Sequence, residues 1–196
     1  MSPRAGLDTE AVVQAAAELV DREGAAALTM SRLAEQLGIR TPSLYNHVDG
    51  LPGLHRALAL RGLQALNEQL TRAVIGKMGP LAVMSLADAL RGFIKEHPGL
   101  YAATVESVYL LSVPDQELQA ESHRILDIIL AVMASYTLTG EDALHAVRGL
   151  RSVVHGFTTL EISGGFGMPL DIDESFRRLV QMLIDSLERR SLTADC

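Results

Sequence analysis

The sequence contains very little cysteine. Its only cysteine is Cys196, so an intrachain disulfide is excluded and the chain fits a reducing compartment. The lone thiol has no neighbours at the spacing of a metal site or of a catalytic nucleophile. We therefore expect neither a disulfide framework nor thiol chemistry.

Long apolar runs are also absent. No apolar segment follows a basic start at the N-terminus, as a signal peptide would require. No apolar stretch approaches the roughly 18 residues that indicate a membrane span. We expect a cytoplasmic protein that does not engage a membrane.

Basic residues are outnumbered by acidic ones. The chain has 17 Lys and Arg against 24 Asp and Glu, which gives a formal net charge of −7 at pH 7. This balance argues against a protein that coats nucleic acid indiscriminately. It leaves room for sequence-specific DNA binding through a small local surface.

The motifs of common enzymes are missing as well. The sequence has no Gly-rich phosphate loop, no His-Glu-x-x-His, no Gly-x-Ser-x-Gly and no carboxylate pair at a catalytic spacing. His123 with Glu121 or Asp127 is the nearest approach to a metal-binding set, but lone histidines on helices more often serve structure. We expect no enzymatic activity, no cofactor and no metal. A helical enzyme without such motifs is the alternative.

What the chain has instead is helical periodicity nearly throughout, without strand alternation. Its 196 residues, 48% of them hydrophobic, suffice for a small domain fused to a larger one. We predict an all-α fold of about nine helices, with a helix-turn-helix DNA-binding domain over residues 1–52 and a helical ligand-binding and dimerisation domain over residues 53–196. Counted from their caps, the predicted helices cover residues 8–23, 29–37, 41–49, 51–75, 81–96, 100–111, 114–136, 139–161 and 173–190.

The most informative segment is residues 28–47, where two short helices flank a tight turn. Gly38 permits the left-handed turn, and Thr41 is expected to cap the second helix with Pro42 at its first position. This is the spacing of a helix-turn-helix, whose second helix reaches base edges in the major groove. A plain helical hairpin is the alternative. The expected small core consists of Leu33, Ala34, Leu37, Ile39 and Leu44.

The N-terminal 60 or so residues resemble the TetR family of transcriptional regulators, with a tetracycline-repressor-like helix-turn-helix. The resemblance is carried by Thr29 before the first helix, the turn over residues 34–39, and the run Leu44-Tyr45-Asn46-His47 on the recognition helix. It implies phosphate contacts from Thr29, Tyr45 and His47. The DNA-binding residues that it implies are Arg4, Thr29, Arg40, Thr41, Pro42, Ser43, Tyr45 and His47.

One position departs from the family pattern. The family usually has a phosphate-binding Lys just after the recognition helix, where this chain has Leu51-Pro52-Gly53. Arg56 is a candidate replacement for that contact. Residues 1–70 hold six Lys and Arg against eight Asp and Glu, so we expect strong reliance on dimerisation. A helical interaction or scaffold protein with a degenerate helix-turn-helix is therefore the alternative function.

The resemblance also implies a dimer interface from two long helices, here residues 139–161 and 173–190. About half of the apolar residues chosen for it should belong to internal core instead. The segment Val154-His155-Gly156-Phe157 resembles a C-terminal subfamily named for a Trp-His-Gly motif, with Val154 in place of Trp. The interface residues we predict are Leu150, Val154, Phe157, Leu160, Phe176, Leu179, Met182 and Leu183.

An effector pocket is expected among the middle helices, apolar with a few polar tips, which suits a small hydrophobic molecule of unknown identity. The function implied is a repressor that binds a palindromic operator in double-stranded DNA as a homodimer. The effector would shift the helix over residues 51–75 and move the two recognition helices off their spacing of about 34 Å. The residues predicted to line the pocket are Met84, Phe93, His97, Tyr101, Val105, Tyr109, Leu126, Met133 and Phe157.

Overall fold

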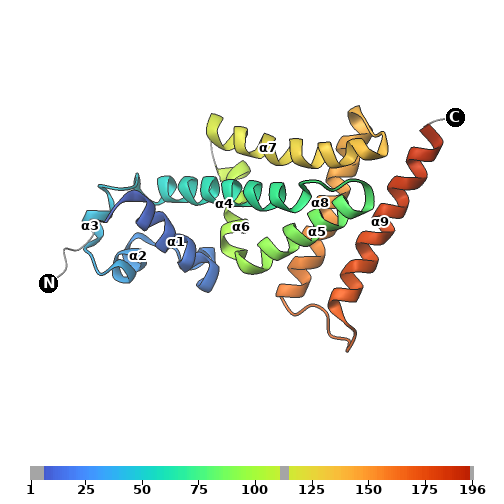
Figure 1. The fold of residues 1–196 in the computed structure, drawn as a ribbon. Coiled ribbons are helices and arrows are strands. Elements are labelled where there is room, and N and C mark those ends of the chain that lie inside the picture. Colours follow the sequence, from blue (N-terminus) through green and yellow to red (C-terminus); the bar gives the residue numbers. More distant parts are fainter. Residues whose placement is uncertain (1–6, 111–114, 195–196) are drawn as a thin grey trace. The chain divides into compact units, whose positions relative to one another are not determined.

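The fold is all-helical, as predicted. The computed structural model describes residues 7–110 and 115–194, and within these ranges it contains helices and turns but no strand (Figure 1). Two short 3₁₀ turns, Ala25–Ala27 and Ala134–Tyr136, accompany the α-helices. The α-helices are α1 (Thr9–Glu23), α2 (Met30–Leu37), α3 (Thr41–Leu44), α4 (Gly50–Val74), α5 (Gly79–Glu96), α6 (Pro98–Leu110), α7 (Gln116–Met133), α8 (Gly140–Ile162) and α9 (Ile172–Ala194).

Local sequence signals set most helix ends. Asp8 caps α1, since its side chain accepts a hydrogen bond from the Ala11 N–H at 2.8 Å. Gly24 ends α1 with a positive φ of 84°. The break expected between the fourth and fifth helices falls after α4 ends at Val74. The helices therefore lie within a few residues of their predicted positions.

The chain divides into two compact units. One unit comprises Met1–Gln64 with Glu96–Gln119, and the other comprises Ala65–Lys95 with Ala120–Cys196. Helix α4 is continuous and contributes to both units. The predicted division at residue 52 concerns function and stays a prediction.

In the first unit, α1 packs against α2 and α6 through a buried apolar face that includes Val12, Ala16 and Leu19. Gly99, at the start of α6, lies directly against the backbone of α1. A Cβ at this position would be 2.2 Å from the Val20 carbonyl oxygen, so a residue with a side chain would force the helices apart. Glycine thus sets how closely α6 packs on α1.

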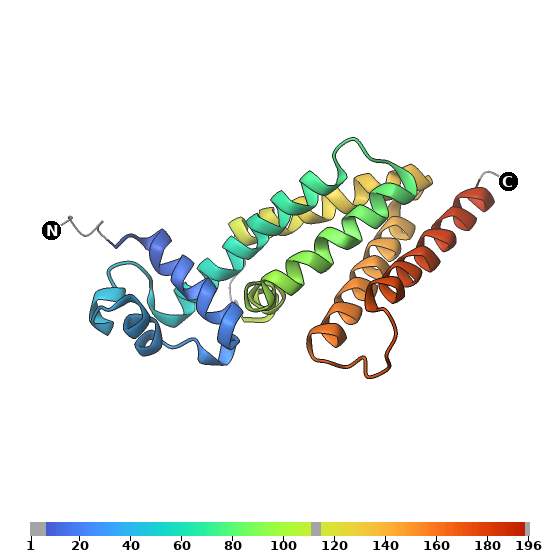
Figure 2. The ribbon, with the colours of Figure 1, turned by 60° about the horizontal axis from the view of Figure 1, so that its bottom comes forward.

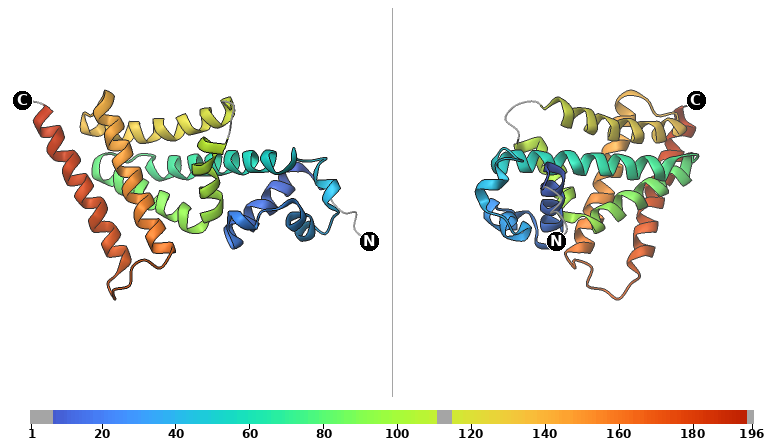
Figure 3. Two further views of the ribbon diagram at one scale, coloured as in Figure 1. Left: turned by 180° about the vertical axis from the view of Figure 1, so that it is seen from behind. Right: turned by 60° about the vertical axis from the view of Figure 1, so that its left-hand side comes forward.

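In the second unit, α8 and α9 lie side by side (Figures 2 and 3). The Phe157 and Phe176 rings, one from each helix, are 5.2 Å apart between centroids. Arg91 of α5 packs over the Phe176 ring at 4.6 Å and forms an ion pair with Glu161 of α8 at 2.8 Å. The side chain of Arg91 is only 11% exposed, so this ion pair joins α5 to the α8–α9 pair in the interior.

No described helix is both long and apolar enough to cross a membrane. Likewise, no group of three His, Cys, Asp or Glu side chains gathers as a metal site would require within the described ranges.

Candidate nucleic-acid interface

The helix-turn-helix is held by local hydrogen bonds. The Thr29 hydroxyl caps α2 by accepting a hydrogen bond from the Arg32 N–H at 3.1 Å. Gly38 ends α2 in the left-handed conformation, with φ 65° and ψ 31°. The Ile39 N–H then donates to the Ala34 carbonyl at 3.0 Å, which satisfies a carbonyl at the helix end. The tight turn predicted at Gly38 is confirmed.

The start of the recognition helix differs from the prediction by one residue. Arg40, not Thr41, occupies the N-cap position of α3, because its backbone is extended with ψ 141°. Thr41 is the first helical residue, and no side chain caps the helix. Pro42 lies in the first turn, where the missing N–H costs no helical hydrogen bond. The Thr41 hydroxyl is therefore not engaged in capping.

The predicted DNA-binding residues differ in their exposure. Tyr45 is 59% exposed, which is high for a tyrosine that follows a buried leucine. Thr29, Arg40 and Pro42 are also exposed, whereas Thr41, Ser43 and His47 are half-buried. Arg4 lies outside the residues that the structure describes.

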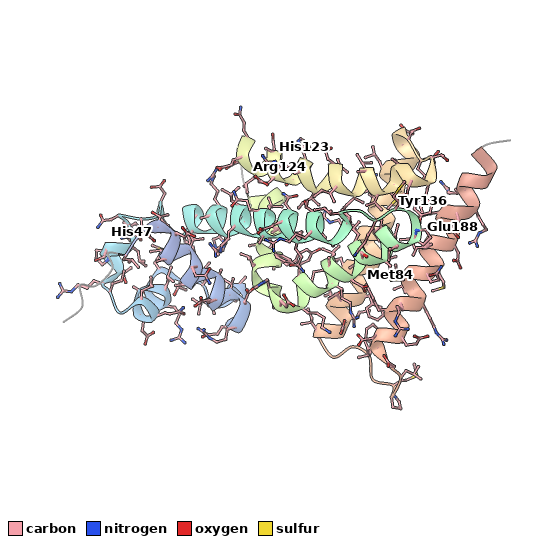
Figure 4. The ribbon with its side chains drawn as sticks, viewed as in Figure 1. His47, Met84, His123, Arg124, Tyr136 and Glu188 are labelled. Carbon is pink, nitrogen blue, oxygen red and sulfur yellow. The ribbon has the colours of Figure 1, made fainter. Side chains whose placement is uncertain are left out.

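The core beneath these residues is as small as predicted. Leu33, Ala34 and Leu44 are buried, and Leu37 and Ile39 are half-buried. The Thr9 hydroxyl of α1 donates to the main-chain oxygen of His47, labelled in Figure 4, at 3.2 Å. This bond fixes the end of the recognition segment against α1, so the position of Tyr45 does not depend on α3 alone.

The arginines around the helix-turn-helix are mostly paired with acids. Arg32 bonds to Glu23 and Glu35, and Arg22 bonds to Glu23. Hydrogen bonds from Arg22 and then from Arg32 lower the pKa of the Glu23 carboxyl. No ion pair of Arg40 is found within the described residues, and its side chain is exposed. Arg40 is thus the cation best placed to meet a phosphate or a base.

Arg56 does not replace the family lysine. Its guanidinium bonds to both carboxylate oxygens of Asp115 and, at 2.8 Å, to Glu117. These hydrogen bonds, with that from Asp115 first, raise the pKa of Arg56 well above its ordinary value. The expectation of a phosphate contact from Arg56 is therefore wrong in this conformation, because the side chain is committed to the start of α7. Position 51 is a half-buried leucine and supplies no charge.

The start of α6 is anchored to α1 by a carboxylate. Asp21 accepts a hydrogen bond from the Leu100 N–H at 2.8 Å, and its other oxygen lies 2.9 Å from Nδ1 of His97. His97 was predicted to contact an effector, but in this structure it pairs with the DNA-binding domain's first helix. Its role in effector binding stays a prediction.

The other predicted effector residues are divided between the two units. Met84, Phe93, Leu126, Met133 and Phe157 belong to the second unit, and Tyr101 and Val105 belong to the first. Phe93, Tyr101, Met133 and Phe157 are buried, whereas Met84, Val105 and Leu126 are half-buried. The side chain of Tyr109 lies outside the described part of the chain.

A pocket of about 440 Å³ lies in the second unit, between the C-terminal ends of α4 and α7. None of its lining residues was predicted from the sequence. The polar residues at the pocket are Thr71, Lys77 and Ser135. Its larger apolar residues are Val74, Ile75, Met78, Ile128 and Val132. The break between α4 and α5 was visible in the sequence, but which helix would close over it was not.

A buried polar pair was also missed. Asn67 of α4 donates from Nδ2 to the main-chain oxygen of Glu121 at 2.9 Å and to its carboxylate at 2.8 Å. Both residues are 8% exposed. The signal that the sequence offered was an asparagine on a helix face otherwise occupied by Leu66 and Leu70, both buried. Sequence reasoning considered Glu121 only as a neighbour of His123.

Four of the eight predicted interface residues are internal core. Leu150, Val154, Phe157 and Phe176 are at most 9% exposed within the single chain, so they cannot present a surface to a second one. Leu160 and Met182 are 51% and 61% exposed.

Leu179 and Leu183 are half-buried. Leu183 packs where Gly149 of α8 leaves room, 4.0 Å from where a Cβ would stand. The candidate interface is therefore defined by Leu160, Leu179, Met182 and Leu183, which we call the α8–α9 face.

Comparison with known families finds two matches that together span most of the chain. A model described as "Bacterial regulatory proteins, tetR family" matches residues 12–47. A model described as "Tetracyclin repressor-like, C-terminal domain" matches residues 83–183, which is just over half of the chain.

Two full-length relatives are both 37% identical to this chain. One is an uncharacterized HTH-type transcriptional regulator of Bacillus subtilis, over 95% of this chain and 96% of that protein. The other is an uncharacterized HTH-type transcriptional regulator of Mycobacterium tuberculosis, over 95% of this chain and 84% of that protein. The tetracycline repressor protein class D of Escherichia coli is 45% identical, but over only 29% of this chain and 26% of that protein.

Solved structures agree on the fold. A structure described as a possible TetR family transcriptional regulator from Streptomyces coelicolor superposes with a TM-score of 0.70, at 20% identity, over 93% of this chain and 99% of that one. A variant of TetR from Acinetobacter baumannii, solved in complex with minocycline, has a TM-score of 0.68 at 23% identity, over 95% and 99% of the two chains.

Proposed function

The chain belongs to the TetR family of transcriptional regulators, and from that premise we propose that it is a repressor that binds a palindromic operator as a homodimer. A small apolar effector then releases it from the DNA. The observation that carries the proposal is the exposed surface of α3, where Tyr45 and Pro42 face outward from a helix held rigidly by Thr29, Gly38 and Thr9.

The chemistry of that surface suits DNA backbone positioning and a limited base readout. A tyrosine hydroxyl and a threonine hydroxyl can donate to phosphate oxygens, and such contacts fix the register of the helix on the duplex. The exposed Arg40 precedes the first turn of α3, where its guanidinium can reach a base edge or a phosphate. Since few cations are unpaired here, each half-site is expected to bind modestly.

Dimerisation supplies the rest of the affinity. A two-fold dimer places two recognition helices on adjacent turns of one DNA face, so the contacts of both half-sites add. The α8–α9 face offers exposed Leu160 and Met182 on two long helices, which a symmetric partner can cover with the same residues. The further match to the Trp-His-Gly subfamily stays a prediction.

Effector release can be transmitted by α4. This helix continues without a break from the first unit, which contains α1–α3, into the second, which contains the pocket. An effector that binds more tightly to the released conformation shifts the population towards it. The alternative, a scaffold protein with a degenerate helix-turn-helix, predicts no specific DNA binding at all.

The test begins with genomic fragments retained by the purified chain at low salt. We expect retention of a small set with a two-fold symmetric sequence, and an affinity that falls steeply with salt. On a retained fragment, Tyr45→Ala should lose most of the binding without a change in thermal unfolding. Phe166→Ala, at an aromatic residue 36% exposed in the second unit, is the control and should bind as the wild type does. If no fragment is retained at any salt concentration, the scaffold alternative replaces the repressor.

A further inference from the structure

Asn67 is an unusual residue for its place in α4. It lies on a face where Leu66 and Leu70 are 4% and 1% exposed, and it is itself 8% exposed. Both of its N–H groups are used, one by the main-chain oxygen of Glu121 and one by the Glu121 carboxylate. Because both partners are acceptors, the amide can have only this orientation.

The carbonyl oxygen of Asn67 is left over. Oδ1 is buried and has no hydrogen-bond partner among the described residues. Buried polar atoms are paired in the great majority of cases, and an exception calls for an explanation. The neighbouring Glu121 offers no donor either, since its other oxygen accepts from Arg124 (Figure 4) at 2.8 Å. This interior position therefore presents an acceptor that lacks a donor.

The 440 Å³ pocket lies on the same faces of the same two helices. Residues four and seven positions apart share one face of a helix, so Thr71 and Val74 continue the face of Asn67 towards the end of α4. Ile128 continues the face of Glu121 along α7 in the same way. The Asn67–Glu121 bridge and the pocket are thus successive parts of one groove between α4 and α7.

We propose that this α4–α7 groove binds the effector, with the apolar part in the pocket and a hydroxyl or ammonium group donating to Oδ1 of Asn67. The proposal rests on the proposed function and names its ligand class. An aliphatic alcohol or amine fits, because the buried end of the groove offers only acceptors. A carboxylate would find no donor at Asn67 and would have to use Lys77 at the other end, whose Nζ already donates to Ser85 at 2.8 Å.

The experiment uses the full chain without DNA, so that its outcome does not depend on operator binding. Isothermal titration calorimetry compares straight-chain alcohols, amines and carboxylates of six to twelve carbons. We expect saturable binding of an alcohol or amine at least tenfold tighter than that of the carboxylate of equal length. The better of the two donor classes identifies the group that meets Asn67. Tighter binding of carboxylates, or no saturable binding by any of the series, overturns the proposal.

Three variants locate the site. Asn67→Leu should weaken binding of the best alcohol or amine about tenfold, the loss expected for one hydrogen bond of ordinary strength. Ala131→Trp, at an exposed residue that lines the pocket, should block the apolar part without disturbing the core. Gln69→Leu is the matched control, an amide on the same helix that donates to the Ala89 carbonyl, and should bind as the wild type does. Full affinity in both Asn67→Leu and Ala131→Trp contradicts the proposal.

Failure of the repressor function would look different. If the chain retains no genomic fragment but binds an alcohol or amine through Asn67, the ligand site stands and the DNA-binding role falls. If operator binding is intact and the three variants are released by no member of the series, while calorimetry shows no binding to the wild type, only the ligand site falls.

Discussion

The helix-turn-helix and the α8–α9 pair differ in what fixes their side chains. Helices α2 and α3 are short, and the bonds that set their geometry join residues at most five positions apart, such as Thr29 with Arg32 and Ala34 with Ile39. Helices α8 and α9 are long, and which of their faces is buried depends on α5 through Arg91. The first kind of site can be predicted from a local pattern, whereas the second requires knowing which helices meet.

The largest effect should come from the exposed side of the α8–α9 pair. Replacing Leu160 and Met182 together by arginine puts four like charges into a symmetric interface, so the protein should become monomeric. Loss of the second half-site should weaken operator binding about a thousandfold, roughly 4 kcal/mol. Sedimentation and operator titration measure the two effects. Leu170→Arg, at a residue 66% exposed in the loop, is the control, and a dimer that survives the double substitution refutes the interface.

The buried side of the same pair is tested by Arg91→Ala. This change leaves the Glu161 carboxylate, 10% exposed, with only Lys95 as its ion-pair partner, and it removes the packing over Phe176. We expect a loss of about 3 kcal/mol in the free energy of unfolding, measured by urea denaturation. Arg177→Ala removes an exposed ion pair with Glu174 and should cost less than about 0.5 kcal/mol. Equal losses in the two variants would show that burial does not govern this contact.

A pH-dependent effect is expected at Tyr136, next to α9. Burial, and then the nearby Glu188 carboxylate (Figure 4), raise the pKa of Tyr136 from 10.0 to about 12. Since the folded pKa lies above the unfolded one, the stabilising contribution is fully present below pH 10 and is lost as the pH rises through 12. The loss should be about 2 to 3 kcal/mol.

Comparison with Tyr136→Phe isolates this contribution. The hydroxyl of Tyr136 has no hydrogen-bond partner among the described residues, so its removal should cost little at pH 7. The stability of the wild type relative to the variant should then fall between pH 10 and pH 12. A difference that stays constant over this range would contradict the raised pKa.

The smallest effect belongs to the local site and has an internal control. Thr29→Ala removes the side-chain cap of α2 and should cost about 1 kcal/mol of stability. Thr139 occupies the N-cap position of α8 but makes no capping hydrogen bond, so Thr139→Ala should be nearly neutral. Thermal unfolding of the two variants measures the difference. Two threonines with equal losses would mean that the cap geometry is not what stabilises α2.

Much of the candidate site could be predicted, and the errors share one cause. The turn at Gly38, the exposed Tyr45 and the small core under Leu44 follow from local pattern. The role given to Arg56 was wrong, because its partner Asp115 is 59 residues away in the sequence. Phe157 and Phe176 were placed on the surface of a dimer because periodicity shows that a face is apolar but not what covers it.

The sequence by itself determined the helices, their caps and breaks, the helix-turn-helix and the family, because these depend on residues close together along the chain. Tertiary structure decided which arginines are available to DNA, which apolar residues remain for a partner, and where Asn67 leaves an acceptor in the interior. Each of these depends on burial or on a partner from a distant helix. Such contacts are set by packing of whole helices, which no local pattern records.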